Sequence, residues 1–439
     1  MKKFSLYTVL FVLIMVTLCL PLVQHVTGLF NMKPLEGFTA PVEPVKLNVR
    51  SFREGTYQAY AQRYLQQHFG FRNLYIRSYN QLMYSCFRQT TNDNVVMGEN
   101  GEFYLRQYTD VYTGKKLRET YGTEDSARAA MRHNVEETCR MIDSLRRFGT
   151  DVIVVLAPSK PLIYPEYLPK EIRQAHCPFS IQEEYAELYA QAGVEHIDFV
   201  PLFRRLKQES PYPVYTRFGT HWSYATIPFV ADTILQKIAA VKHCPMPHVV
   251  YGDSNFTYRY KGSDRELEGQ LNLLFPLHHG KIPMPEYSLQ EDRAYRKPNL
   301  LVVGDSYFTQ LRNTGFMKAF NQVDYWKYND EAISSIPERN GKMPLVNRYE
   351  IITQADVILL VFTDMHAYDY LFGFLRTAER TLADGPDHDP QKAISKIVEA
   401  IKASPEWYEK VRKQAEEKNI SLEECLRGNA EWVYEQNYK

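Results

Sequence analysis

The residues whose types best suit catalysis lie at Gly304–Tyr307, where Gly-Asp-Ser-Tyr follows an apolar, β-branched run. Such a run predicts a buried strand, and Gly304 ends it. We therefore expect Ser306 where a strand ends and a helix begins, with its backbone N–H near a helix N-terminus. A serine nucleophile in acyl transfer needs this setting. An ordinary helix cap formed by Asp305 and Ser306 fits the same residues, and the motif alone favours the cap.

A serine nucleophile needs a base within hydrogen-bond reach, and His221 is the candidate among the 12 histidines. His221 lies in the segment Arg217–Ser223, beside Trp222 and just before a predicted helix. Functional residues concentrate in such loops. A solvated or structural histidine is the alternative.

The elements that must position these residues read as an α/β domain. Apolar runs predict strands at 151–157, 194–199, 299–303, 323–328 and 355–362, and helical patterns lie at 124–147, 180–191 and 224–241. Near-continuous apolar strands that alternate with helices predict a parallel sheet covered on both faces, a three-layer fold. Ligands of such sheets bind beyond the carboxyl ends of the strands, and Ser306 follows one of these ends.

The N-terminus carries a targeting signal. Lys2 and Lys3 precede an apolar run from about Leu6 to Val23, which predicts a signal peptide or a single membrane-spanning anchor. The lysines place the N-terminus in the cytoplasm and the chain after about residue 28 outside, on the periplasmic side in a Gram-negative cell. No small-x-small cleavage site follows the run, which favours a retained anchor.

We divide the chain into five segments. Residues 1–28 are the anchor or signal peptide, and the proline-containing stretch 29–50 is a linker. Two helical patterns, about 52–68 and 71–87, make 51–94 an N-terminal helical segment. Residues 95–377 form the α/β domain and begin with a predicted hairpin at 95–105. Residues 378–439 are a charged helical extension.

Composition excludes several classes of function. Lys plus Arg equals Asp plus Glu at 52 each, so the charge balance gives no sign of a nucleic-acid partner. The six cysteines are widely and irregularly spaced, which matches neither a disulfide framework nor a zinc pattern. No metal-ligand cluster or phosphate-binding glycine loop is present in the sequence, and we expect no bound cofactor. The 32 tyrosines suit either carbohydrate clefts or ordinary cores.

The motifs together resemble the SGNH-hydrolase-like polysaccharide O-acetyltransferases of the AlgX/AlgJ type, over most of residues 50–365. The family's Gly-Asp/Thr-Ser-Phe/Tyr motif matches Gly304–Tyr307, and its Asp-x-His-Trp motif matches Gly219–Trp222. Three weaker matches lie in the expected order, at His68–Arg72, Val96–Leu105 and Pro158–Pro169. The resemblance implies a three-layer SGNH-hydrolase-like fold, related to the flavodoxin type.

One position departs from the family pattern, because Gly219 stands where the family has its aspartate. That aspartate orients the histidine and stabilises the imidazolium. Asp264 and Asp364 are candidate substitutes by loop position. A backbone carbonyl that holds the ring, in a Ser–His dyad, is a second possibility. A degenerate site that binds glycan without turning it over is a third.

The targeting signal and the resemblance together imply an exported, membrane-anchored enzyme in which His221 activates Ser306 for acetyl transfer to a polysaccharide. The backbone N–H of Ser306 would form part of the oxyanion hole, and Asn329 is a guess for the second donor. Trp222 and Tyr307 either contact sugar or pack beside the site. A carbohydrate acetyl-esterase has the same residues. A membrane-bound acyltransferase is the partner that the resemblance implies as acetyl donor.

Overall fold

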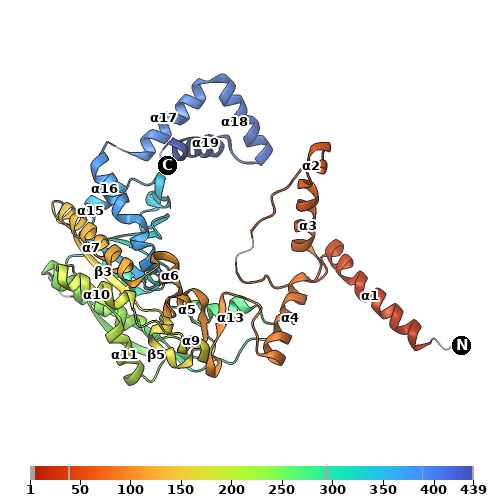
Figure 1. The fold of residues 1–439 in the computed structure, drawn as a ribbon. Helices are drawn as coiled ribbons and strands as arrows, with labels where there is room; N and C mark the ends of the chain where they lie inside the picture. Colours follow the sequence, from red (N-terminus) through yellow and green to blue (C-terminus); the bar gives the residue numbers. More distant parts are fainter. Residues whose placement is uncertain (1–4, 38–39, 292–294, 388, 438–439) are drawn as a thin grey trace.

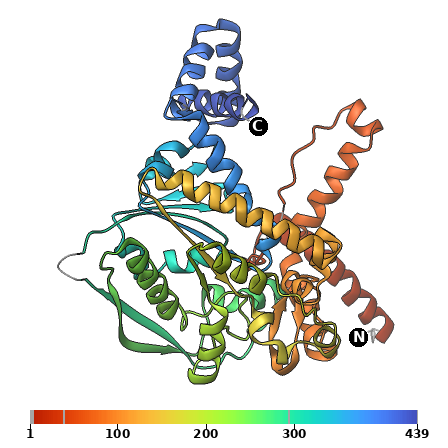
Figure 2. The same cartoon turned by 60° about the vertical axis from the view of Figure 1, so that its left-hand side comes forward.

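The computed structural model describes residues 5–37, 40–291, 295–387 and 389–437. An α/β body forms the centre of the molecule, and one group of helices projects from it at each end of the chain (Figures 1 and 2).

The body is built on a seven-stranded sheet with the order β10-β9-β8-β7-β11-β3-β4. The strands are β3 (Asp151–Ala157), β4 (His196–Asp198), β7 (Asn299–Gly304), β8 (Gln322–Lys327), β9 (Glu331–Ser334), β10 (Gly341–Lys342) and β11 (Val357–Thr363). The five strands from β8 to β4 pair in parallel, which confirms the expected parallel core. The purely parallel sheet needs a correction, because β9 and β10 add two antiparallel strands at one edge. Both are short and partly exposed, so they lack the apolar run that predicts a strand.

Helices cover both faces of the sheet, which confirms the three-layer architecture. Side chains of the central strands alternate between the two faces, so Ile153 and Val155 belong to one core cluster while Val152 and Val154 belong to the other. The first cluster includes residues of α5 (Arg106–Tyr112), α11 (Val200–Glu209), α12 (Ile227–Lys242) and α14 (Tyr307–Arg312). The second includes residues of α7 (Glu124–Arg146), α10 (Ile181–Ala192), α15 (Arg348–Gln354) and α16 (Phe374–Asp384). Shorter helices are α6 (Lys115–Tyr121), α8 (Lys160–Ile163), α9 (Lys170–Gln174) and α13 (Glu266–Leu271).

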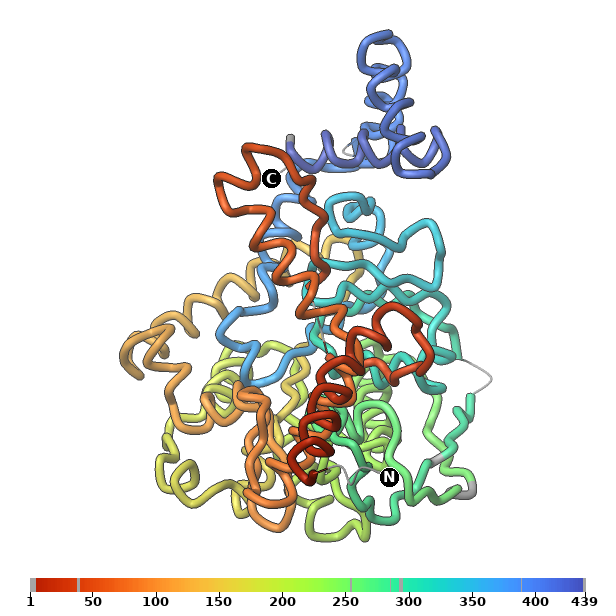
Figure 3. Tube along the Cα trace, turned by 90° about the vertical axis from the view of Figure 1, so that its right-hand side faces the viewer, coloured from red at the N-terminus to blue at the C-terminus, as the bar shows by residue number. Residues whose placement is uncertain are grey.

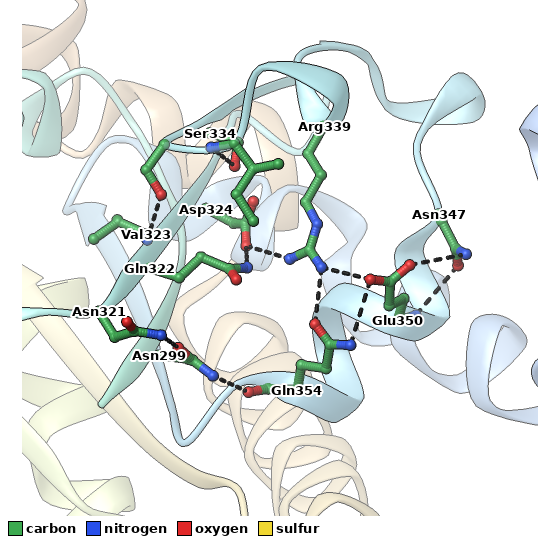
Figure 4. A network of polar contacts seen from close by, with 12 residues as sticks. Asn299, Asn321, Gln322, Val323, Asp324, Ser334, Arg339, Asn347, Glu350 and Gln354 are labelled. Atoms are coloured by element: carbon green, nitrogen blue, oxygen red, sulfur yellow. Dashed lines mark hydrogen bonds and ion pairs between the residues drawn. The ribbon is translucent and has the colours of Figure 1, made fainter. Parts of the chain in front are cut away.

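The amino end of the parallel strands is closed by a polar network (Figure 4). Arg339 donates to Asp324 of β8 at 3.2 Å and to Glu350 of α15 at 2.6 Å. Asn299, the first residue of β7, donates to the backbone carbonyl of Gln354 at 3.1 Å. These contacts tie β7, β8 and α15 together at this end. Ligands of such sheets bind at the opposite edge, beyond the carboxyl ends of the strands.

Two antiparallel hairpins lie outside the main sheet. The predicted one is present as β1 (Val95–Met97) paired with β2 (Phe103–Leu105). The second, β5 (His248–Thr257) with β6 (Ile282–Gln290), was not predicted. Helix α13 lies in the segment between β5 and β6, so it is an insertion between these two strands.

The N-terminal part contains α1 (Leu6–Thr27), α2 (Val49–Arg53), α3 (Thr56–His68) and α4 (Arg72–Phe87). Among the described residues, α1 is the one helix long and apolar enough to cross a membrane. At 1.5 Å per residue its 22 residues span about 33 Å. Lys2 and Lys3, on which the predicted orientation depends, lie outside the described residues. The expected helices at 52–68 and 71–87 are present as α3 and α4.

The C-terminal part is a three-helix group formed by α17 (Pro390–Ala403), α18 (Pro405–Lys418) and α19 (Leu422–Asn437). Its helices share a core cluster that includes Ile394, Val411 and Leu426. Figure 2 shows this group standing off the α/β body. The helical character predicted for the C-terminal extension is confirmed.

Candidate active site

Ser306 lies at the carboxyl edge of the sheet, between the end of β7 and the start of α14. Gly304 is required just before it, because a Cβ there would lie 2.7 Å from the carbonyl oxygen of Val361 in β11. Asp305 is fully buried and accepts hydrogen bonds from the backbone N–H groups of Tyr307 and Thr363 at 3.0 and 2.9 Å. The aspartate therefore fixes the turn that presents the Ser306 hydroxyl.

The structure brings His221 to this turn from the loop before α12. Its Nε2 lies 2.8 Å from Ser306 Oγ. Tyr307 supports the loop, since its hydroxyl donates to the carbonyl of Thr220 at 2.7 Å and its ring centroid lies 4.6 Å from that of His221. Ser306 and His221, which the sequence predicts as nucleophile and base, are thus in hydrogen-bond contact.

Glu266, the first residue of α13, holds the other imidazole nitrogen. Its carboxylate oxygens lie 2.8 and 3.0 Å from His221 Nδ1. The same carboxylate accepts from the backbone N–H of Thr220 at 2.8 Å, which fixes the carboxylate against the loop. Burial lowers the pKa of His221, but the charge and hydrogen bond of Glu266 outweigh it and leave this pKa raised above its ordinary value. The arrangement is a Ser–His–Glu chain of hydrogen bonds.

Neither predicted substitute for the missing aspartate contacts His221, so this expectation is corrected. Asp264 is buried and accepts from the backbone N–H of Tyr224 at 3.4 Å. Burial raises the pKa of Asp264 to about 8, so its carboxyl is mostly protonated at neutral pH and provides little negative charge. Asp364 accepts from the Ser159 hydroxyl at 2.5 Å, and burial raises its pKa to about 6.

The surroundings of Gly219 explain why the carboxylate comes from a different element. A Cβ at Gly219 would lie 2.7 Å from the carbonyl oxygen of Ser263 and 2.7 Å from Thr216 Oγ1. The segment that leads into α13 therefore occupies the space that an aspartate side chain needs. The same segment supplies Glu266, so one segment both excludes a side chain at position 219 and provides the acid that contacts His221.

The expected second oxyanion donor, Asn329, points away from Ser306. Its side-chain amide donates to the carbonyl of Phe372 at 3.1 Å and to Thr377 Oγ1 at 2.9 Å. Tyr328, one residue earlier, lies at the site instead. Burial raises the pKa of Tyr328, and hydrogen bonds with the side chain and backbone of Ser306 oppose this rise. The Tyr328 hydroxyl thus lies beside Ser306.

Trp222 and Tyr307 are fully buried, which excludes the alternative that either ring stacks on a sugar. Trp222 packs against Phe199, Phe203 and Tyr307, with centroids 4.9 to 6.0 Å apart. Both residues therefore belong to the packing that positions His221.

Lys160 holds the His221 loop in place through hydrogen bonds to its backbone. Its position in the sequence gave no reason to expect this role. Its buried ammonium group forms an ion pair with Glu102 at 2.8 Å. It also donates to the carbonyls of Phe103, Thr216 and Arg217 at 2.8 to 3.0 Å. Burial is the main cause of a lowered pKa for Lys160. The lysine ties hairpin β1–β2 to the loop that carries His221.

Glu266 and Tyr328 are the site residues that sequence reasoning missed. Both lie within two positions of residues that it named, Asp264 and Asn329. The polarity of each segment was visible in the sequence. Which side chain in each segment faces His221 or Ser306 depends on the folded backbone and on contacts between distant parts of the chain, which a lone sequence does not provide.

Comparisons with known proteins support the family resemblance. A family model described as "SGNH hydrolase-like domain, acetyltransferase AlgX" matches residues 111–324. This match confirms the family resemblance over these residues.

Among curated proteins, the chain is similar to the probable alginate O-acetylase AlgJ of Pseudomonas aeruginosa. The two are 24% identical over 276 residues, and the match covers 62% of each chain. This chain therefore spans less than two thirds of the length of that relative. Among solved structures, it is similar to the O-acetyltransferase domain of Pseudomonas putida AlgJ, with a TM-score of 0.42, 15% identity and coverage of 65% of this chain and 99% of the other. Pseudomonas aeruginosa AlgX gives a TM-score of 0.42, 16% identity and coverage of 64% and 67%.

Proposed function

We propose that this chain is an exported, membrane-anchored O-acetyltransferase that acts on a cell-envelope or secreted polysaccharide. The observation that carries the proposal is the hydrogen-bonded chain from Ser306 Oγ through His221 to Glu266. An alcohol activated by an oriented imidazole is the arrangement that acyl transfer requires. The Glu266 carboxylate also weakens the case for a degenerate site, which rested on Gly219.

The first half-reaction forms an acetyl-enzyme. His221 Nε2 takes the proton of the Ser306 hydroxyl while Oγ attacks the carbonyl carbon of the acetyl donor. The tetrahedral intermediate expels the donor's leaving group, which takes the proton from His221, and an ester remains on Ser306. Glu266 stays ionised, keeps the proton of the neutral imidazole on Nδ1 and stabilises the imidazolium.

The second half-reaction passes the acetyl group to the sugar. A hydroxyl of the polysaccharide attacks the ester carbonyl while His221 accepts its proton. The proton then returns to Ser306 Oγ as the ester bond breaks, so the enzyme is regenerated and the sugar ester is released. The backbone N–H of Ser306 and the Tyr328 hydroxyl are the proposed donors to the oxyanion in both half-reactions.

The wider setting is also proposed. Helix α1 is the retained anchor, and residues 95–377 form the catalytic domain on the extracytoplasmic side, facing the periplasm in a Gram-negative cell. The family resemblance supports a polysaccharide substrate and a membrane-bound acyltransferase as the acetyl donor. AlgJ, a relative of this chain, is described as a probable alginate O-acetylase, which supports a glycan acceptor.

The test measures where the acetyl group goes. The full chain is supplied with an aryl acetate and with neutral or acidic oligosaccharides, and acetylated sugar and free acetate are quantified separately. We expect acetylated sugar from the unmodified protein and none above background from Ser306→Ala. The exposed Ser395→Ala on α17 serves as a matched control and should behave as the unmodified protein. Free acetate alone would assign an acetyl-esterase, and unchanged transfer by Ser306→Ala would refute the serine mechanism.

A further inference from the structure

Helix α3 carries an apolar stripe that the described chain covers only in part, with Tyr64, Leu65 and His68 exposed. The stripe has helical spacing and consists of Tyr57, Tyr60, Ala61, Tyr64, Leu65 and His68. Its rings form a ladder, with Tyr57–Tyr60, Tyr60–Tyr64 and Tyr64–His68 centroids 6.0, 5.9 and 4.1 Å apart. No residue of α3 is buried. Because an isolated helix of 13 residues is marginal in water, this stripe requires a further surface to pack on.

Helix α4 continues the uncovered surface. One side of α4 contacts the body, since Arg77 donates to the carbonyl of Leu273 at 3.1 Å and Asn80 donates to that of Leu271 at 2.8 Å. A second stripe, Tyr75, Tyr79, Leu82 and Cys86, is exposed along the helix. Tyr75, Tyr79 and Leu82 are 44 to 56% exposed, far more than core residues of the body.

The uncovered surface is continuous with the proposed membrane anchor. The last turns of α1 cross the junction between α3 and α4, where the backbone of Pro21 lies against Gly70 so closely that no side chain fits. The ring nitrogen Nδ1 of His25 also lies 2.8 Å from the carbonyl oxygen of His68. Figures 1 and 3 show α1 beside this junction. The junction therefore lies where α1 would leave the bilayer.

The charge of this segment is also distinct from the rest of the chain. Residues 46–88 contain seven cationic side chains, from Lys46, Arg50, Arg53, Arg63, Arg72, Arg77 and Arg88, and one acid, Glu54. The whole chain has 52 of each sign. Aromatic and leucine side chains beside basic ones are typical of helices that lie in the interface of an anionic membrane.

We propose that the α3 stripe and the exposed stripe of α4 lie in the interfacial layer of an anionic bilayer, beside the point where α1 emerges. Tyrosine rings occupy the headgroup level, leucines reach the acyl boundary and the exposed arginines Arg53, Arg63 and Arg88 pair with lipid phosphates, whereas Arg77 is buried against the body. This surface holds the catalytic body in a fixed pose at the membrane. The inference rests on the proposed anchor and extends it from one helix to a second, monotopic contact.

The test uses the full chain in bilayers made either of phosphatidylcholine alone or of phosphatidylcholine with phosphatidylglycerol. A photoreactive carbene precursor dissolved in the acyl layer labels side chains that reach it, and peptide mapping identifies them. We expect labels on α1 in both bilayers. Labels on α3 and α4 are expected as well, and they should be several-fold stronger with the anionic lipid.

The outcomes separate the inference from the proposed anchor. Labels on α1 with none on α3 or α4 would overturn the inference, because water, a second copy or another protein would then cover the stripes. Unlabelled α1 with labelled α3 and α4 would refute the anchor and overturn the inference as stated, because the stripes would then bind the bilayer without an emerging α1 beside them. Unlabelled helices throughout would refute both.

Charge-insertion variants sharpen the test. Leu65→Glu and Tyr79→Glu should each reduce the labels on α3 and α4 several-fold while α1 remains labelled. Trp432→Glu on α19, a position 62% exposed, is the matched control and should change nothing. The far-UV circular dichroism spectrum and the urea midpoint report whether each variant is folded. Folded Leu65→Glu and Tyr79→Glu variants with undiminished labels would contradict the proposal.

Discussion

At the scale of single residues, the ability of His221 to act as a base depends on the partner of its second ring nitrogen, Nδ1. Nε2 faces Ser306 Oγ at 2.8 Å, and Nδ1 faces the Glu266 carboxylate at the same distance. The carboxylate selects the tautomer with its proton on Nδ1, which leaves Nε2 free to accept the serine proton. Glu266 is thus a positioning residue that acts through His221.

Glu266→Gln tests this role. Loss of the acid from a serine-protease triad costs about 10⁴-fold in kcat, and we expect a fall of roughly 10³ to 10⁴-fold here with KM little changed. His221 must be neutral to act as a base, so activity rises with pH through its raised pKa. Without the Glu266 charge, burial becomes the dominant influence and lowers the pKa of His221 against the smaller raising effect of Asp305, so the rising limb should move to lower pH.

A pH–rate profile of both proteins checks this prediction. The exposed Glu338→Gln serves as the control and should leave rate and profile unchanged. An unshifted limb in Glu266→Gln, or a loss of less than tenfold, would mean that Glu266 is not the functional partner of His221.

At the scale of elements, the site joins four pieces of chain at the carboxyl edge of the sheet. These are the β7–α14 turn, the His221 loop, the start of α13 and the residue after β8. The segment before α13 leaves no room for a side chain at position 219. The carboxylate that contacts His221 therefore comes from Glu266 of α13.

Gly219→Asp tests this exclusion. The new Cβ would overlap the carbonyl oxygen of Ser263, and relieving the overlap shifts either the His221 loop or α13. We expect the substitution to destabilise the protein by about 1–3 kcal/mol and to lower kcat. In the Glu266→Gln background it should restore nothing. Urea unfolding and acetyl-transfer rates check both expectations, and recovery of activity in the double variant would contradict the steric account.

Lys160→Met tests whether the ion pair and hydrogen bonds of Lys160 hold the His221 loop in place. It leaves Glu102 and three backbone carbonyls without their cation, and losing one partner of a buried ion pair typically costs about 3–5 kcal/mol. We expect the urea midpoint to fall accordingly, with a larger proportional loss of kcat than of substrate affinity. The exposed Lys396→Met on α17 is the matched control. An unchanged midpoint in Lys160→Met would show that these contacts contribute no stability.

The sequence sufficed for elements whose residues carry a local pattern. The five parallel strands are near-continuous apolar runs, and Ser306 and His221 stand in short motifs at element boundaries. The β5–β6 hairpin and the edge strands β9 and β10 lack such runs, so they were missed. Glu266 was missed with them, because it lies on a short helix between β5 and β6 whose contact with His221 is long-range.

At the scale of the whole molecule, the chain combines an α/β body with two appended groups of helices (Figures 1 and 2). The C-terminal group has its own core cluster and contacts the body around Met343–Leu345. A polar tie joins them as well, since Gln391 donates to the carbonyl of Leu345 at 2.7 Å. The parallel sheet and the active site lie outside this group.

This separation predicts two steps of thermal unfolding. The small C-terminal core should melt before the body, because a group of this size buries less apolar surface per residue. Calorimetry of the full chain checks for a first, smaller transition, and Ile394→Ala should lower that transition alone. A single cooperative transition that moves as a whole in Ile394→Ala would contradict the separation.

The most direct test of the account is to trap the acetyl group on the enzyme. The full chain is mixed with an aryl acetate, quenched in acid and digested, and the site of acetylation is found by mass spectrometry. We predict an acetyl ester on Ser306 that disappears when an oligosaccharide acceptor is added, as acetylated sugar accumulates. Acetylation confined to other residues, or an ester on Ser306 that no acceptor discharges, would contradict the proposed mechanism.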